Sequence, residues 1–220
     1  AGAGPAAIPT LFSTGLDEDG EPLSPGQTDP HYTNAATDLP LLAMQNHPAW
    51  LANNSQSLWV GLSGNGADNL PAGSYTFETR FDLSGFDPAS AQITLRVAVD
   101  DELTAVRLNG TATGITASGF SGWSGPFVIE DGFTDGVNSL EFVFVNGGSS
   151  PNPSGLRVDL SGTAVAHPGR TALSADARAC YFRKAFDYEP DPAASLSLHL
   201  SPWIADGAVF YLNGMPVYRH

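Results

Sequence analysis

The stretch YTFETRFDLSGFDPASAQITLRVAVDDELTAVRLNG, from Tyr75 to Gly110, decides the fold. In its first part, YTFETRFD, and again in ITLRVAV, apolar side chains occur at every second position. A period of two places alternate side chains on opposite faces of a strand, so each part predicts a half-buried β-strand. The stretch ends in Asn109-Gly110. Because Asn and Gly both tolerate positive φ, this pair predicts the tip of a two-residue β-hairpin.

The chain contains a second, shorter copy of this stretch, which reads CYFRKAFDYEPDPAASLSLHLSPWIADGAVFYLNG over residues 180–214. Phe-Asp, Asp-Pro and Leu-Asn-Gly occur in the same order in both copies. The first copy continues into further alternating segments, whereas only a few residues follow Gly214. The sequence therefore predicts three parts: a complete module at 8–164, a linker at 165–177, and the N-terminal half of a related module at 178–220.

Alternation also recurs outside the repeat, at residues 140–144 and 156–160, and a short apolar run occurs at Trp59-Val60. Many of the 24 glycines and 17 prolines lie between these segments, as turn residues do. No segment keeps a helical period for three turns, although residues 39–52 are compatible with a short helical turn. A chain with many short strands must cover its sheet edges, so the expected fold is an all-β sandwich of the jelly-roll type.

The net charge of −14 excludes some classes of partner. Lys184 is the only lysine, and a surface so poor in bases repels the phosphates of nucleic acids and of anionic membranes. No run of 18 apolar residues occurs, so we expect no membrane insertion. Cys180 is the only cysteine, which excludes a disulfide within one chain.

Several segments resemble one known kind of module. They are residues 11–32, LFSTGLDEDGEPLSPGQTDPHY; residues 135–146, DGVNSLEFVFVN; and residues 152–164, NPSGLRVDLSGTA. Over residues 8–164 the chain resembles a galactose-binding-domain-like jelly roll of exported, multi-modular bacterial proteins. The second copy, with DGAVFYLNGMPVYR, resembles sister modules of secreted or cell-surface hydrolases and adhesins. The resemblance implies an extracellular or cell-surface location and a non-catalytic carbohydrate-binding role, and many such relatives hold a structural calcium ion.

The leading functional hypothesis is therefore a non-catalytic binding module whose partner is a polysaccharide or glycan. One alternative is a structural or adhesive subunit that self-associates, a neighbouring chain supplying the strands that the half module lacks. Another is an accessory domain of a larger secreted hydrolase. An enzyme is not expected, because Gly-x-Ser-x-Gly and His-Glu-x-x-His are both absent, and no Asp or Glu stands inside an apolar strand.

Sugars are bound by an aromatic face together with a few planar hydrogen-bonding groups. Aromatic residues outside the expected strands are therefore the candidate ligand-binding residues, with an asparagine as an amide partner. The candidates are Trp50, Trp123, Tyr32, His31 and Asn146. The alternative for each ring is a place in the core, where large amphipathic side chains are often buried.

Two acidic segments are candidate calcium sites, because calcium binds six to eight hard oxygen ligands. The first contains Asp17 and Asp19 in LDEDGEPL, with Asp29 nearby. The second contains Asp100 and Asp101. The alternatives are an acidic hairpin turn for the first segment and a solvated loop for the second.

Overall fold

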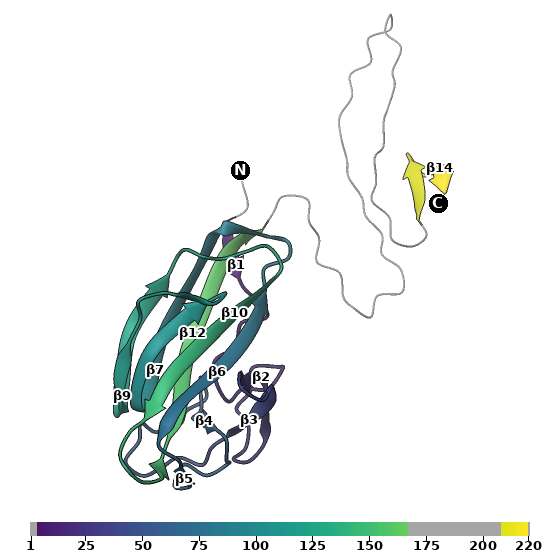
Figure 1. The fold of residues 1–220 in the computed structure, drawn as a ribbon. Coiled ribbons are helices and arrows are strands. Elements are labelled where there is room, and N and C mark those ends of the chain that lie inside the picture. The colour runs from purple at the N-terminus through teal and green to yellow at the C-terminus, as the bar shows by residue number, and fades with distance from the viewer. Residues whose placement is uncertain (1–3, 167–207, 220) are drawn as a thin grey trace, which may run out of the picture. The chain divides into compact units, whose positions relative to one another are not determined.

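The structure is a computed structural model of the chain, and it describes residues 4–166 and 208–219. The chain divides into two compact units, Ala1–Leu173 and Ser174–His220 (Figure 1). Within the described residues every regular element is a β-strand, which confirms the predicted all-β class. None of these residues forms a helix with the length and hydrophobicity that a membrane span requires.

The first unit contains twelve strands in its described residues. Their bounds are β1 Pro5–Ala7, β2 Thr28–Asn34, β3 Leu39–Ala43, β4 Val60–Gly61, β5 Asn69–Leu70, β6 Gly73–Asp82, β7 Phe86–Leu108, β8 Thr111–Ala112, β9 Ala117–Ile129, β10 Val137–Asn146, β11 Asn152–Pro153 and β12 Gly155–Ala166. The sequence was compatible with a short helical turn at residues 39–52, but the first five of these residues form strand β3. Its backbone pairs with β2 and β4 instead of bonding within a helix.

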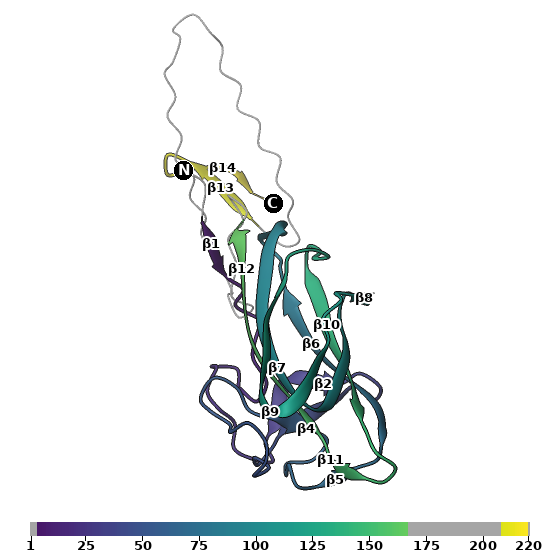
Figure 2. The same cartoon turned by 90° about the vertical axis from the view of Figure 1, so that its left-hand side faces the viewer.

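The strands form two layers that share one long strand. In the first layer β7 lies between β9 and β12, and β1 pairs with the end of β12 (Figures 1 and 2). In the second layer the order is β3, β2, β6, β10 and then β7 again, with β8 at the edge. β4 joins β12 to β3 on the other side. The two layers are therefore connected along both sides, and the predicted sandwich is confirmed.

β7 passes from one layer to the other near its middle. Its first part, up to Asp100, pairs with β12, and its last part, from Glu102 to Leu108, pairs with β10. The acidic residues at 100–102 therefore lie inside a strand. The sequence predicted a solvated loop here, and that prediction is wrong, because an interruption of the apolar pattern marks the change of layer rather than the end of the strand.

The core lies between the layers and follows the predicted alternation. The buried positions of β6, β10 and the first part of β7 repeat with a period of two, whereas residues 97–100 of β7 and 155–158 of β12 are buried on both faces. The aromatic rings of β6 and β10 pack together. The main members are Phe77, Phe81, Ile93, Leu95, Val97, Leu140, Phe142, Phe144, Leu156 and Val158. Each such side chain contributes roughly 1.5–3 kcal/mol through burial, so this core can carry the fold of the first unit.

The described residues of the second unit form one hairpin, β13 Val209–Leu212 and β14 Met215–Arg219. Its turn repeats that of the first unit. Asn109 and Gly110 have φ of 50° and 77°, and Asn213 and Gly214 have φ of 50° and 84°. Positive φ at both turn residues is what a type I′ hairpin requires, so both predicted tips are confirmed. The other strands expected in the half module, near 181–186 and 196–200, lie outside the described residues, as does Cys180.

Candidate functional site

The outer face of the first layer carries polar side chains that point away from the core. Because Leu95 and Val97 face inward, their neighbour Arg96 faces outward, and the same holds for Arg157 and Asp159 on β12. The register places Asp159 opposite Arg96, and Arg157 opposite Ala98. Arg96 and Asp159 form an ion pair whose side chains are 40% and 20% exposed. The face therefore offers a guanidinium and a carboxylate to solvent.

Part of this face is covered by residues 44–59, which we call the covering loop. Trp50 and Trp59 pack on each other with ring centroids 4.4 Å apart, and together with Met44 they bury Ala98 of β7. The Trp59 indole donates a hydrogen bond to the Leu51 carbonyl at 2.8 Å. The covering loop thus forms a second, small apolar cluster on the outside of the sheet.

Trp123 lies at the border of this cluster because β9 bulges. Val97 pairs with Ser124 and Val99 pairs with Gly119, so four residues of β9, 120–123, stand opposite a single residue of β7. Extra residues in one strand bend it and redirect its side chains. Gly119 has φ of 97°, a conformation that favours glycine. The bulge carries Phe120 and Trp123, both partly buried against the cluster.

The Trp123 ring has two guanidinium groups beside it. The Cζ atom of Arg157 lies 4.7 Å from the ring centroid, and that of Arg96 lies 4.9 Å from it. Cations at this distance are attracted by the π electrons, so both arginines hold the ring in place. Unlike Trp50 and Trp59, the partly exposed Trp123 has no acceptor for its indole N–H within the described residues. The indole N–H is therefore a free donor on a ring that is partly exposed.

Arg157 is fully buried beneath this ring. Its Nε donates to Ser57 Oγ at 3.0 Å, and Nη1 donates to the carbonyl oxygens of Leu51 and Ala52, whereas Nη2 has no partner within the described residues. Burial lowers the pKa of Arg157 to about 10, although Asp159 opposes the change. The side chain stays charged at neutral pH and joins the covering loop to β12.

Trp50 belongs to the small cluster and not to an open surface. It is 5% exposed, and its indole donates to Asp100 Oδ2 at 2.8 Å. Asp100 is itself only 7% exposed, and burial together with the neighbouring Asp101 carboxyl raises its pKa to about 7. Asp101 accepts a hydrogen bond from the Gly147 N–H at 2.7 Å. The expectation that no carboxyl lies inside an apolar strand is therefore wrong for Asp100.

The structure places the remaining predicted ligand residues in structural roles. Tyr32 is fully buried, and its hydroxyl donates to the Phe12 carbonyl at 2.9 Å, so its ring offers no surface to a ligand. His31 stacks on the Phe12 ring at 3.8 Å and donates from Nε2 to the Asp17 carbonyl. Asn146 is buried and donates to the Leu70 carbonyl at 2.7 Å. These three residues do not join Trp123.

The first acidic segment uses its carboxylates to fix the backbone. Asp17 Oδ1 accepts from the N–H groups of Asp19 and Glu21, which confirms the acidic hairpin turn. Asp29 is fully buried and accepts from Gly15, His31 and Tyr32. Burial raises the pKa of Asp29, and these backbone donors act against the rise.

Over the described ranges, 4–166 and 208–219, no three His, Cys, Asp or Glu side chains come together to hold a metal ion. The calcium ion expected from the sequence resemblance therefore stays a prediction. A melting curve recorded with chelator and again with calcium tests it, because a ligand of the folded state raises the melting temperature.

Sequence reasoning found Trp123 but missed Arg96, Arg157 and Asp159. The alternation in LRVDLS assigns Arg157 and Asp159 to the polar face of β12, and that assignment is correct. What the sequence did not reveal is that the covering loop lies over this face. The three repeated Ser-Gly pairs at 118–125 are the available signal for a bulged strand.

No protein-family model matches this sequence, and neither does any curated protein. Among solved structures, the chain is similar to the CBM35 from Paenibacillus barcinonensis. The two share 16% sequence identity over 59% of this chain and 92% of that chain, with a TM-score of 0.33.

Proposed function

We propose that this chain is a non-catalytic, extracellular carbohydrate-binding module and that Trp123 is the centre of its binding surface. The observation that carries the proposal is the partly exposed Trp123 ring, held by two guanidinium groups on the outer face of the first layer. An aromatic face packs against the C–H groups of a sugar ring. The Arg96–Asp159 pair beside it offers planar donors and acceptors for sugar hydroxyls.

The surroundings of Trp123 support binding rather than hydrolysis. Glycoside hydrolysis uses two carboxyl groups on either side of the scissile bond. Asp159 is engaged in an ion pair with Arg96, the arginine that lies over this ring. Asp100, whose pKa is about 7, is buried and bonded to the Trp50 indole on the inner side of the small cluster. Neither residue is arranged as a general acid for a sugar on the Trp123 surface.

A glycan array followed by affinity electrophoresis tests the proposal. We expect the intact chain to be retarded by at least one polysaccharide, and Trp123→Ala to weaken binding about tenfold or more, as loss of a central aromatic contact does. Tyr211→Ala is the matched control, since Tyr211 is an exposed aromatic residue, 59% accessible, in the other unit. If no glycan binds, or if both variants lose binding equally, the proposal fails.

The hairpin of the second unit favours a second candidate function, a self-associating structural or adhesive subunit. Its exposed side chains include Tyr211, Met215 and Val217. In the first unit the equivalent strand segment, ending at Leu108, pairs with β10. A neighbouring chain that pairs with β13 in the same way would cover this hairpin. Light scattering tests the candidate. A monomer at micromolar concentration argues against self-association. The remaining alternative to a carbohydrate-binding module is then an accessory domain of a larger secreted hydrolase.

A further inference from the structure

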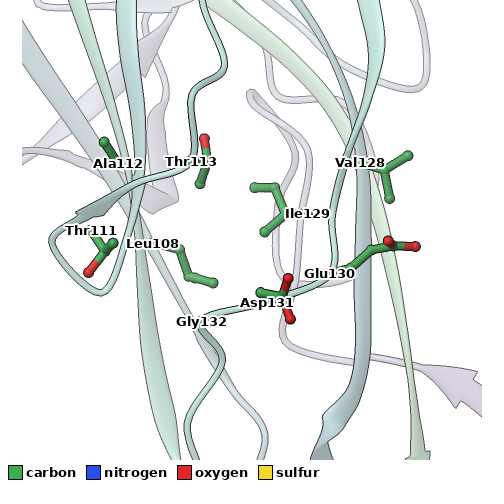
Figure 3. Close-up of a pocket in the computed structure, with 9 residues that line it drawn as sticks. All are labelled: Leu108, Thr111, Ala112, Thr113, Val128, Ile129, Glu130, Asp131 and Gly132. Atoms are coloured by element: carbon green, nitrogen blue, oxygen red, sulfur yellow. The ribbon is translucent and has the colours of Figure 1, made fainter.

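A pocket of about 360 Å³ lies apart from Trp123, between the β7–β8 hairpin and the end of β9 (Figure 3). One wall is Leu108 with residues 111–113, and the other is formed by residues 128–132. The Asn109 side chain ties the two walls together, because its Nδ2 donates to the Gly132 carbonyl at 2.9 Å. The volume is at the small end of the range for ligand sites, about 300–1,000 Å³, so it suits one ring-sized ligand.

The floor of the pocket is apolar and fixed. Leu108 and Ile129 point into the space between the walls (Figure 3), and they are only 1% and 5% exposed, so they close the bottom of the pocket while the core holds them in place. Gly132 has φ of 89°, and a Cβ at this position would come within 3.3 Å of Leu108 Cδ2. The close approach of Gly132 therefore keeps this end of the pocket in shape. A ligand that fills the site needs a hydrocarbon surface to place against the two side chains.

The charge of the pocket is entirely negative. Its ionisable lining residues are Glu130 and Asp131, and no Arg, Lys or His among residues 4–166 and 208–219 lines it. Arg107, next to Leu108 in the sequence, is paired with Glu141 at 3.6 Å. Glu130 Oε1 accepts from Gln92 at 2.5 Å and its side chain is directed away from the space in Figure 3. The carboxylate of Asp131 is exposed to solvent and has no protein partner in the part of the chain that the structure describes.

Hydroxyl groups complete the lining. Thr113 Oγ1 donates to the Val106 carbonyl at 2.9 Å and accepts from the Ile115 N–H at 3.4 Å, so one of its lone pairs is left for a further hydrogen bond. Thr111 is exposed on the same wall, on β8. The site therefore combines an apolar floor, two hydroxyls and one unpaired carboxylate. A ligand that matches all three has a compact ring, hydroxyl groups and one positive charge.

We propose that this pocket is a separate binding site for a protonated amino sugar. The sugar C–H face packs on Leu108 and Ile129, the ammonium group pairs with Asp131, and the threonine hydroxyls bond to ring hydroxyls. Charge complementarity selects the amine over a neutral hexose, because a charge-assisted hydrogen bond to an unpaired carboxylate is stronger than a neutral one. An anionic sugar is repelled by the same carboxylate.

Backbone amide NMR on the intact chain tests the site with three probes: D-glucosamine, N-acetyl-D-glucosamine and D-glucose. At about pH 6 the primary amine is protonated. We expect glucosamine to shift the amide signals of Thr113, Ile129 and Gly132, and the two neutral sugars to bind about two- to fivefold more weakly. Equal shifts with all three probes overturn the charge argument, and no shift at these residues overturns the site.

Asp131→Asn removes the charge while keeping the size of the side chain. We expect it to weaken glucosamine binding about two- to fivefold, the range of one solvent-exposed ion pair. Asp68→Asn is the matched control, since Asp68 is exposed beside β5, well away from β8 (Figure 2). Ala112→Trp fills the pocket without changing charge and should also abolish binding. If Asp68→Asn weakens binding as much as Asp131→Asn, only the net charge matters and the site is refuted.

Titration with calcium distinguishes an amino-sugar site from a simple cation site. If calcium alone produces the same shifts and excludes glucosamine, the pocket is a cation site and the amino-sugar assignment is wrong. The pocket and the Trp123 surface are tested separately, because Trp123→Ala should leave the glucosamine shifts unchanged.

Discussion

At the scale of single residues, the outer face of the first layer is organised by buried charges. Arg157 is held by Ser57 and two carbonyl groups of the covering loop, and Asp100 is held by the Trp50 indole. A buried ionisable group is tolerated only when partners replace its water. These two residues therefore fix the covering loop against β12 and β7, and the loop in turn supports Trp123.

The Asp100 carboxyl should make stability depend on pH. Its pKa is about 7 in the folded chain against 3.8 ordinarily, so between these values the folded state binds a proton that the unfolded state has lost. The free energy of unfolding contributed by Asp100 is then fully present below about pH 4 and declines as the pH rises toward 7.

Asp100→Asn, which mimics the protonated carboxyl, should remove that decline. Urea unfolding at several pH values measures the effect, with Asp68→Asn as the exposed control. The same slope in Asp100→Asn and the parent chain would show that Asp100 does not titrate in this way.

At the scale of elements, the turns rely on glycines for different reasons. Gly110 has φ of 77° with open space around it, so alanine there meets only backbone strain. Gly15 has φ of 76°, and a Cβ would lie 2.4 Å from Leu58 Cβ. Gly122 has neither a left-handed φ nor a close neighbour. Alanine substitutions at these three positions therefore distinguish the cost of backbone strain from the cost of steric overlap with a neighbour.

We expect Gly122→Ala to leave the unfolding free energy nearly unchanged and Gly110→Ala to lower it by about 1 kcal/mol, the cost of a left-handed non-glycine residue. Gly15→Ala should cost more than Gly110→Ala, since the Leu58 side chain and backbone must also move. Chemical denaturation of the three variants measures the series. The order would be contradicted if Gly15→Ala were the mildest of the three.

The strands were predictable from sequence where alternation is regular. β6 and β10 bury one side of a period-two pattern, and Asn109-Gly110 and Asn213-Gly214 specify their turns through local backbone preference. β7 was not predicted in full, because Asp100–Glu102 interrupts the apolar pattern while the backbone continues to pair with β12 and β10. A change of partner strand leaves no local signal.

The candidate site was only partly predictable for a related reason. Trp123 stood out as an aromatic residue among glycines, but Trp50 has a similar sequence context and is buried. What separates the two rings is the covering loop, whose Leu51 N–H donates to the Phe120 carbonyl at 2.7 Å. That contact joins residues far apart in the sequence, and no pattern within either segment specifies it.

At the scale of the whole molecule, the first unit has a complete core of its own. Its last strand, β12, pairs with both β1 and β7, so the described strands of this unit are paired without the second unit. A chain ending at Leu173 should therefore keep the melting transition of the first unit. Differential scanning calorimetry of the intact and shortened chains measures this. A shortened chain that fails to fold would show that the second unit is required.

The most direct test of carbohydrate binding is the indole N–H spectrum of the intact chain, titrated with the glycan that the array selects. Trp50 and Trp59 have their indole N–H groups bonded to Asp100 and Leu51, whereas that of Trp123 is free within the described residues. Trp→Phe variants assign the signals. We predict that the Trp123 signal shifts in proportion to the glycan bound while the Trp50 and Trp59 signals stay in place. A glycan that binds and leaves the Trp123 signal unmoved would contradict the proposed binding surface.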